Sequence, residues 1–446
     1  MSLNIEQNHA LKALNSGVNT FITGGAGVGK TTVLKEFICK QAQKGKNIMI
    51  TAPTGIAALG IGGVTLSKAF KIPFGVLTYK IKQLDAPDEL VNSDIVIIDE
   101  ISMCRIDTFD FICNKILNAN VRRRNMGMKT IQLVVVGDFF QLPPVMTNKE
   151  KELLNNYYGF DIGLGFAFMS KFWKMFKFYN IMLTIVERQH DKEFVENINK
   201  IRVGSKAYIE QIVSMSSPVK IDRGIMICSV NSEVNRINTE ELNKIPGKSV
   251  TYTAQKTGDA TEQDVIADEM LTLKLGARVM VLANIDQAAN GTLGVVKGLY
   301  SDGVVVELDN GVQVALGEYK WEVYNYRLVE VDGEEKLEQF VSGTFTQIPL
   351  KLAYAITIHK SQGQTYDSIN ISPYCWECGQ LYVAISRARD IARVYFNYKP
   401  STSYIVVSLN VIKFYNSLQL GMKLPDSDRE EELDKDISII LERLGG

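Results

Sequence analysis

Short apolar runs alternate with segments of helical periodicity through the first 183 residues of the chain. These runs are rich in Val and Ile and show little period-two alternation; they are "VNTFITG" (18–24), "NIMITA" (47–52), "DIVIID" (94–99), "IQLVVVG" (131–137) and "FYNIMLT" (178–184). Strands that are buried on both faces of a parallel sheet have this pattern. Because the intervening segments are long enough for crossover helices, we expect residues 1–183 to form an α/β domain.

A second α/β pattern begins near residue 224 and is then interrupted. "GIMICSV" (224–230) predicts a strand, and a helical segment follows it. Residues 246–340 are instead rich in Val and Gly, and their NG and DG turn signals fall at 290–291, 302–303, 310–311 and 332–333. Strand-length runs such as "GVVVEL" (303–308) and "VQVAL" (312–316) lie between these turns. The segment is typical of a small antiparallel barrel or sandwich.

The α/β pattern resumes after about residue 345 with "LAYAITI", "SINIS" and "RVYFNY". We therefore expect residues 184–245 and 341–446 to form a second α/β domain that carries residues 246–340 as an insertion. The tail past residue 400 is predicted to be helical, and its mixed-charge run "DSDREEELDKD" indicates a solvated helix face.

Composition narrows the class of protein without identifying a function. The 49 basic and 50 acidic residues give a net charge of −1, so nucleic-acid binding would require a local basic groove. No apolar run is long enough to span a membrane, and the amino terminus carries no targeting pattern. Six cysteines in 446 residues favour a reducing compartment over a disulfide framework. We expect a cytoplasmic protein, bacterial or viral, with no membrane partner.

The stretch "GGAGVGKT" (Gly24–Thr31) fits G-x-x-x-x-G-K-T, with a predicted strand before it and a predicted helix after it. Glycines allow backbone N–H groups to approach phosphates closely, and the helix start adds partial positive charge. Lys30 would reach the β and γ phosphates, and the Thr31 hydroxyl would bind Mg²⁺. The residues expected to hold the nucleotide here are Gly25, Gly27, Val28, Gly29, Lys30, Thr31 and Thr32.

Two further strand ends supply groups for hydrolysis. Asp99 ends an apolar strand, where its carboxylate would bind Mg²⁺, and Glu100 would polarise a water for attack on the γ-phosphate. This pair favours ATP hydrolysis over transfer to an acceptor, and no N-K-x-D motif supports a GTPase. Gln141, in "VVVGDFFQLPPV" (134–145), would bond the γ-phosphate or the attacking water and respond when the phosphate leaves.

Seven motifs, taken in order, resemble those of superfamily-one DNA helicases. They are "GGAGVGKTT", "APTGIAA", "IIDEISM", "GDFFQLPPV", "ERQ", "HKSQGQT" and "YVAISRAR". "DEISM" together with "GDFFQLPPV" looks most like the petite-integration-frequency (PIF) helicase family. The segment between them resembles that family's signature, and it departs from it at "RNMGMKTIQ". The motifs span roughly residues 3 to 398.

The resemblance implies a fold and an activity. It implies two RecA-like P-loop domains with parallel sheets, a small wedge-like excursion from the first at about 60–85, and an SH3-like β insertion in the second. It implies ATP and Mg²⁺ as cofactors and 5′ to 3′ translocation on single-stranded DNA. Single-stranded and forked DNA are the expected partners, G-quadruplex DNA is a further candidate, and a monomer is expected in isolation. The family also implies roles in DNA repair, recombination and telomere maintenance.

The resemblance further implies roles for individual residues. Arg188 in "TIVERQ" and Arg387 in "YVAISRARD" become arginine-finger candidates for the transition state. Gln7 would read the adenine edge by two hydrogen bonds. The segment "ITIHKSQGQT" (356–365) would link the ATP site to DNA, with Gly363 at the nucleotide and His359, Lys360 and Thr365 at the DNA.

A DNA track is also expected along the first domain. Its candidate residues are Pro53, Thr54, Gly55, Ser67 and Phe70. Backbone N–H groups at Thr54 and Gly55 would hold a phosphate, and Phe70 or Phe74 would stack on a base. The alternative, that both phenylalanines are buried core residues, stays open at this point.

Taken together, the sequence predicts an ATP-dependent 5′ to 3′ DNA helicase that translocates on single-stranded DNA and unwinds duplex DNA. Two alternatives stay open. One is a nucleotide-switched binding module that hydrolyses ATP without moving along a strand. The other is an RNA helicase or translocase, since reading a 2′-OH needs only one well-placed donor.

Overall fold

The computed structural model describes residues 3–73, 75–77, 86–189, 191–222, 224–258, 267–285, 288, 290–331, 334–418 and 420. The chain divides into two compact units. The first unit comprises Met1–Arg188 and Val407–Gly446, and the second comprises Gln189–Val406. Within the part of the chain that the structure describes, no helix combines the length and apolar character needed to cross a membrane.

A six-stranded parallel sheet forms the centre of the first unit, with strand order β3-β2-β4-β5-β1-β6. The strands are β1 (Thr20–Gly24), β2 (Ile48–Ala52), β3 (Val64–Thr65), β4 (Ile95–Ile98), β5 (Gln132–Val136) and β6 (Tyr179–Leu183). The predicted parallel sheet is therefore confirmed. Only β3 was missed, because two residues are too short to give a pattern.

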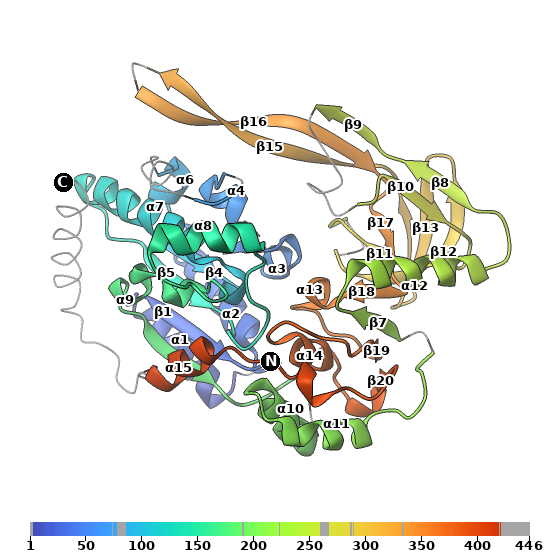
Figure 1. Cartoon of the computed structure of the whole chain (residues 1–446). Coiled ribbons are helices and arrows are strands. Elements are labelled where there is room, and N and C mark those ends of the chain that lie inside the picture. Colours follow the sequence, from blue (N-terminus) through green and yellow to red (C-terminus); the bar gives the residue numbers. More distant parts are fainter. Residues whose placement is uncertain are drawn as a thin grey trace. The chain divides into compact units, whose positions relative to one another are not determined.

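Both faces of this sheet are apolar and are covered by helices (Figure 1). Phe21 and Ile98 belong to one core, whereas their neighbours Ile22 and Ile97 belong to the other, as alternation along a strand requires. The helices of this unit are α1 (Ile5–Asn15), α2 (Lys30–Gln43), α3 (Gly55–Gly60), α4 (Leu66–Phe70), α6 (Asp88–Val91), α7 (Ile106–Asn125), α8 (Asn148–Tyr158), α9 (Lys171–Met175) and α15 (Leu409–Ser417).

Helix α15 belongs to the first unit, which corrects the expectation that residues 341–446 lie wholly in the second domain. Its Phe414 ring stacks on Phe168 at a centroid distance of 4.3 Å, and it meets Phe139 edge-on at 5.4 Å. The neighbouring Tyr415 stacks on Phe140 at 4.7 Å. The tail was placed wrongly because its aromatic partners are far away in the sequence. The mixed-charge run beyond α15 lies outside the described residues.

The second unit contains a four-stranded parallel sheet with strand order β18-β7-β19-β20. The strands are β7 (Ile225–Cys228), β18 (Ala355–Thr357), β19 (Ile369–Ile371) and β20 (Val394–Phe396). The helices of this unit are α10 (Lys192–Arg202), α11 (Ile209–Met215), α12 (Asn231–Lys244), α13 (Ile358–Ser361) and α14 (Gln380–Ile385). The predicted return of the α/β pattern after the insertion is confirmed, because β18 follows the insertion and pairs with β7.

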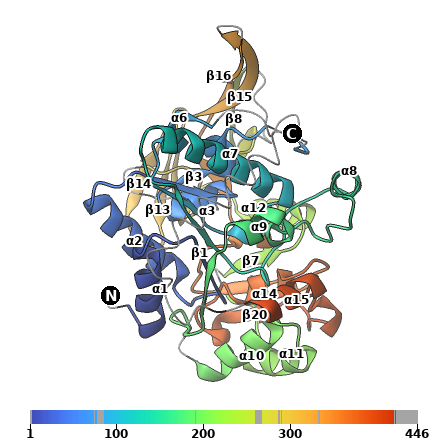
Figure 2. The same ribbon diagram turned by 90° about the vertical axis from the view of Figure 1, so that its left-hand side faces the viewer.

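The insertion is antiparallel and has a core of its own. A five-stranded sheet has the order β14-β13-β12-β11-β17, and β8 with β10 and β9 with β15 and β16 form two smaller sheets. The strands are β8 (Val250–Thr253), β9 (Gln255–Gly258), β10 (Met270–Leu273), β11 (Arg278–Val281), β12 (Leu293–Tyr300), β13 (Gly303–Leu308), β14 (Gln313–Leu316), β15 (Tyr319–Val331), β16 (Glu334–Gln347) and β17 (Leu350–Leu352). Strands β15 and β16 form a long two-stranded arm (Figures 1 and 2).

The turn signals at 302–303 and 310–311 do connect paired strands. The expected end of the insertion at residue 340 is wrong, however, because β16 continues to Gln347 and β17 pairs with β11 through Val279 and Leu352. The run "LKLAYAITI" is continuously apolar, so β17 and β18 could not be told apart in the sequence. The expected wedge-like excursion at about 60–85 includes β3 and α4, and residues 74 and 78–85 lie outside the described residues.

The packing of α15 leads to a stability prediction. We expect Phe414→Ala to destabilise the first unit by about 3 kcal/mol, the lower end of the range for a core phenylalanine, because this ring is only partly buried. The control Leu409→Ala lies on the same helix, and it should have little effect because its side chain is 72% exposed. Hydrogen exchange of the β1 amides measures the difference. Unchanged exchange in Phe414→Ala would mean that α15 does not support this unit.

Candidate active site

Residues 25–29 form the loop between β1 and α2. Carbonyl groups of this loop accept hydrogen bonds from neighbouring parts of the chain. The Gly27 carbonyl accepts the N–H groups of Glu187 (2.8 Å) and Arg188 (3.2 Å). Lys30 Nζ donates to the carbonyls of Gly24 (2.7 Å) and Gly25 (2.9 Å). In a trans peptide the C=O and the following N–H point in opposite directions. The opposite side of the loop therefore presents backbone N–H groups, as a phosphate requires.

Helix α2 begins directly after this loop. Its N-cap Gly29 makes no side-chain cap bond, and its first turn contains no acidic residue. The first N–H groups of a helix lack intrahelical partners, so this helix start suits an anion. Thr31 and Thr32 are exposed at the start of the helix. The predicted phosphate-binding residues are thus contiguous in space as well as in sequence.

Gln7 lies against the same loop although it comes from α1. The side chain is 3% exposed, and its Nε2 donates to the Val28 carbonyl at 3.2 Å. Asn4 and Gln7 form a capping box at the start of α1, which fixes this rotamer. Gly29 is held at φ 81, a conformation that favours glycine, and a Cβ there would lie 2.3 Å from Gln7 Nε2 and displace that amide. The structure therefore brings Gln7 to the edge of the phosphate loop.

Asp99 is buried at the end of β4, with 6% of its surface exposed. The N–H of Glu100 donates to its Oδ1 at 2.9 Å. Burial and the nearby Glu100 carboxylate raise the pKa of Asp99 to about 7, and the Lys30 ammonium opposes this rise. The groups around Asp99 therefore compensate the negative charge of its carboxylate only in part.

The oxygen donors of Asp99 and Thr31 fit Mg²⁺, which prefers hard ligands. Among the described residues there is no cluster of three or more His, Cys, Asp or Glu side chains suited to a metal. A Mg²⁺ ion that takes its other ligands from phosphates and water needs no such cluster. The undercompensated charge of Asp99 is consistent with a cation at this position.

Glu100 is held in a left-handed backbone conformation, with φ 50 and ψ 44. This conformation costs a non-glycine residue about 1–2 kcal/mol. The end of β5 packs tightly against the segment that follows Glu100, since a Cβ on Gly137 would lie 2.9 Å from the N atom of Ile101. The strain is thus imposed by the sheet at a residue that the sequence analysis assigned to catalysis.

Gln141 and Asp138 form a buried pair beyond β5. They are 4% and 0% exposed, and Gln141 Nε2 donates to Asp138 Oδ2 at 3.5 Å. The Tyr415 hydroxyl of α15 lies 3.4 Å from Asp138 Oδ1 and 2.5 Å from Thr23 Oγ1. Tyr415 could not be identified from the sequence, because nothing local marks a tyrosine in the tail as a partner of these motifs.

Arg387, on the other hand, lies in the second unit and is almost fully buried, with 1% exposed. Its Nε donates to the Val383 carbonyl at 2.8 Å, and its Nη1 donates to the carbonyls of Gln364 (3.1 Å) and Ser361 (3.4 Å). The guanidinium therefore fastens α14 to the loop that contains Gly363. Arg188 is partly buried in the first unit, and its backbone contact with Gly27 ties it to the phosphate loop.

His359 and Lys360 lie on α13, each beside a charged residue that the sequence analysis did not single out. His359 Nε2 is 3.5 Å from Glu377 Oε2. Burial lowers the pKa of Lys360, and the adjacent Lys351 ammonium lowers it further. Lys351 itself pairs with Asp268 at 2.6 Å. Spacing alone does not reveal these contacts. Glu377 lies beyond β19, and Asp268, the partner of Lys351, lies within the insertion.

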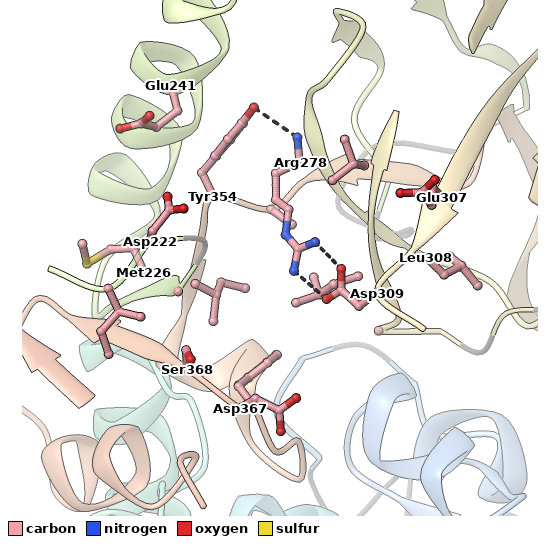
Figure 3. A pocket seen from close by; sticks show the side chains of 18 of the residues that line it. Asp222, Met226, Glu241, Arg278, Glu307, Leu308, Asp309, Tyr354, Asp367 and Ser368 are labelled. Atoms are coloured by element: carbon pink, nitrogen blue, oxygen red, sulfur yellow. Dashed lines mark hydrogen bonds and ion pairs between the residues drawn. The ribbon is translucent and has the colours of Figure 1, made fainter. Parts of the chain in front are cut away.

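Thr365 lines a cavity of about 1040 Å³ between the parallel sheet and the insertion of the second unit. Arg278 and Asp309 form a two-bonded ion pair in its wall, and the Tyr354 hydroxyl accepts the Arg278 N–H at 3.1 Å (Figure 3). Gln364 also lines this cavity. The segment that carries Gly363 and Thr365 thus contacts both Arg387 and the cavity next to the insertion.

The expected DNA track in the first unit is only partly accessible. Pro53, Thr54 and Gly55 are partly buried at the start of α3, and a Cβ on Gly55 would meet nothing within 4 Å. Ser67 is exposed. Phe70 is 0% exposed in the core, which corrects the expectation that it stacks on a base; the alternative of a core residue holds. Phe74 lies outside the described residues.

Comparison with known families matches three parts of the chain. The PIF1-like helicase family matches residues 2–213, the Pif1 helicase 2B domain matches residues 259–299, and the UvrD-like helicase C-terminal domain matches residues 352–395. These parts contain the phosphate loop, part of the insertion, and the segment from β17 to β20 that includes Arg387.

Curated relatives match almost the whole chain. The ATP-dependent DNA helicase Pif1 of Campylobacter jejuni is 31% identical over 89% of this chain and 94% of its own length. The PIF1 helicase of Danio rerio is 33% identical over 96% of this chain, which spans 66% of that longer protein.

Solved structures agree with this result. The structure of Bacteroides Pif1 bound to single-stranded DNA has a TM-score of 0.74 and 34% identity, and it covers 94% of this chain and 97% of its own. Pif1 helicase from Candida albicans has a TM-score of 0.75 and 30% identity, with 94% and 100% covered. The expected fold, two RecA-like domains with parallel sheets, is confirmed. The chain therefore belongs to the Pif1 family of ATP-dependent DNA helicases.

Proposed function

We propose that this chain hydrolyses ATP to move along single-stranded DNA in the 5′ to 3′ direction and to unwind duplex DNA. The proposal is supported mainly by the phosphate loop, whose carbonyls already accept hydrogen bonds from within the protein. Lys30, at the end of this loop, interacts with Asp99, which with Glu100 follows β4. The direction of movement rests on membership of the family. Single-stranded and forked DNA are the substrates, and G-quadruplex DNA is a further one. The protein is a monomer in isolation and acts in the cytoplasm. Its roles are in DNA repair, recombination and telomere maintenance.

In the proposed site, the N–H groups of the loop and of the α2 start bind the phosphates. Lys30 exchanges its bonds to the Gly24 and Gly25 carbonyls for phosphate oxygens, which form stronger charge-assisted bonds. The amide of Gln7 uses one N–H on Val28 and one lone pair on Asn4. A primary amide retains a second N–H and a second lone pair, which are the two groups that reading an adenine edge requires.

Hydrolysis is assigned to groups on the first unit. Mg²⁺ held by Asp99 and Thr31 would neutralise charge on the phosphates. Glu100 polarises the attacking water, and its strained backbone keeps the carboxylate in place. Gln141 senses the γ-phosphate, and its bond to Asp138 links this response to Tyr415 and α15.

Arg188 and Arg387 are the proposed arginine fingers. Arg387 now donates to Val383, Ser361, Gln364 and Ser386, so a phosphate bound to it would compete with these acceptors. Release of these acceptors would free the loop that holds Gly363 and Thr365, next to His359 and Lys360. The contacts of the protein with DNA phosphates would then change with the state of the nucleotide. The residues proposed to make these contacts are His359, Lys360, Thr365, Pro53, Thr54, Gly55 and Ser67. Such contacts make binding strongly dependent on salt and weakly dependent on sequence.

The first test is ATP hydrolysis with and without single-stranded DNA. We expect single-stranded DNA to stimulate the wild type, and Lys30→Ala to lower the rate at least about 100-fold, as for loss of other groups that stabilise transition-state charge. Lys35→Ala, an exposed lysine on the same helix, is the control and should keep the wild-type rate. Hydrolysis that ignores DNA would favour the nucleotide-switched module. Equal stimulation by RNA of the same length would favour an RNA translocase.

The buried Asp99 gives a pH-dependent prediction. Its pKa rises from 3.8 to about 7 on folding, so ionisation of Asp99 destabilises the nucleotide-free protein progressively between these values. Asp99→Asn keeps an oxygen that accepts the Glu100 N–H and removes the charge. We expect it to raise the melting temperature most near pH 8, and the gain should shrink as pH falls toward about 4. Thermal melts in the absence of nucleotide measure it. A gain independent of pH would contradict the assignment.

A further inference from the structure

A loop follows β19 (Figure 1). This loop exposes two large aromatic rings. Tyr374 is 50% exposed and Trp376 is 49% exposed. Their ring centroids are 5.6 Å apart, and the Tyr404 ring meets Tyr374 edge-on at 5.8 Å. Cys375, between the two rings, is 2% exposed. The backbone thus alternates, turning one small side chain inward and two large rings outward.

This exposure is imposed by a fixed backbone. The Gln380 side chain is 0% exposed, and its Oε1 accepts the N–H groups of Trp376 (3.1 Å) and Glu377 (3.4 Å). Ser229 Oγ donates to the Tyr374 carbonyl at 2.5 Å. Exposed aromatic rings forgo the favourable burial that their large apolar area offers. A cluster of exposed rings that buried polar groups hold in place is therefore typical of a binding surface.

The rings lie at the same sheet edge as the proposed DNA-binding helix α13. Strands β18, β7 and β19 are parallel neighbours, so their carboxyl ends share one edge. α13 follows β18, and the aromatic loop follows β19. Glu377, next to Trp376, lies 3.5 Å from His359. The aromatic rings are thus one residue away from direct contact with a proposed phosphate-binding residue.

We propose that Tyr374 and Trp376 form a stacking platform for unpaired bases of the strand whose phosphates contact His359 and Lys360. This inference rests on the proposed function. Every base has a π-face, so stacking on Trp and Tyr holds a strand without reading its sequence. A translocating protein needs this property, because it must grip each successive base. Because Glu377 contacts His359, binding of a base on the platform would affect binding of a phosphate at α13, and the reverse.

The test compares two strands that differ only in their bases. Binding of a fluorescent oligo-dT is measured by anisotropy beside a strand of equal length in which abasic sites replace the bases. The wild type should bind oligo-dT more tightly than the abasic strand. Trp376→Ala should bind oligo-dT about 5- to 150-fold more weakly, the range expected for loss of one stacked base. It should lose most of the preference over the abasic strand, because binding to phosphates remains.

Two further variants sharpen the result. Trp376→Phe keeps an aromatic face and should restore most of the preference for oligo-dT. Tyr300→Ala removes a ring that is 58% exposed on the insertion, and it should behave as the wild type. Trp376→Ala that retains the wild-type preference would overturn the platform while leaving the proposed function intact. A wild type that binds neither strand would overturn the proposed function, and the platform with it.

Discussion

The arrangement of peptide groups around the phosphate loop is the constraint on which the rest of the site depends. Carbonyls of this loop accept from Gln7 on α1, from the backbone at Glu187 and Arg188, and from Lys30. Each of these bonds turns a carbonyl outward and leaves the following N–H on the other side. One short segment therefore contacts the residues of the first unit that are candidates for binding adenine, for binding phosphate and for the arginine finger. At Gly29 its positive φ favours glycine, and Gln7 approaches closely there.

The same unit is closed by a helix from the far end of the chain. Phe414 and Tyr415 of α15 pack against Phe139, Phe140 and Phe168. Through its hydroxyl, Tyr415 also reaches Thr23 on β1 and Asp138 beyond β5. Residues that surround the γ-phosphate in the proposed mechanism are thus connected to a helix that follows the second unit in the sequence.

How far the sequence predicts this protein depends on the range of the interactions. Buried parallel strands and the phosphate loop are local patterns, so the sheet was predictable from the chain alone, as were the positions of Lys30 at the start of α2 and of Asp99 and Glu100 after β4. The roles of these three residues stay predictions. Tyr415 and Glu377 contact residues that are distant in the sequence, and Lys351 likewise pairs with the distant Asp268; periodicity carries no record of such pairs. Phe70 illustrates the opposite error. Its position in the sequence was compatible with a core residue and with a ring that stacks on a base, and in the structure it is a core residue.

The central claim is that ATP hydrolysis in this site drives movement along DNA in one direction. The most direct measurement is strand separation of two duplexes that are identical except for a single-stranded tail, at either the 5′ or the 3′ side. With ATP and Mg²⁺, the account predicts unwinding of the 5′-tailed duplex, little unwinding of the 3′-tailed duplex, and none in Lys30→Ala. Equal unwinding of both duplexes, or a preference for the 3′ tail, would contradict it.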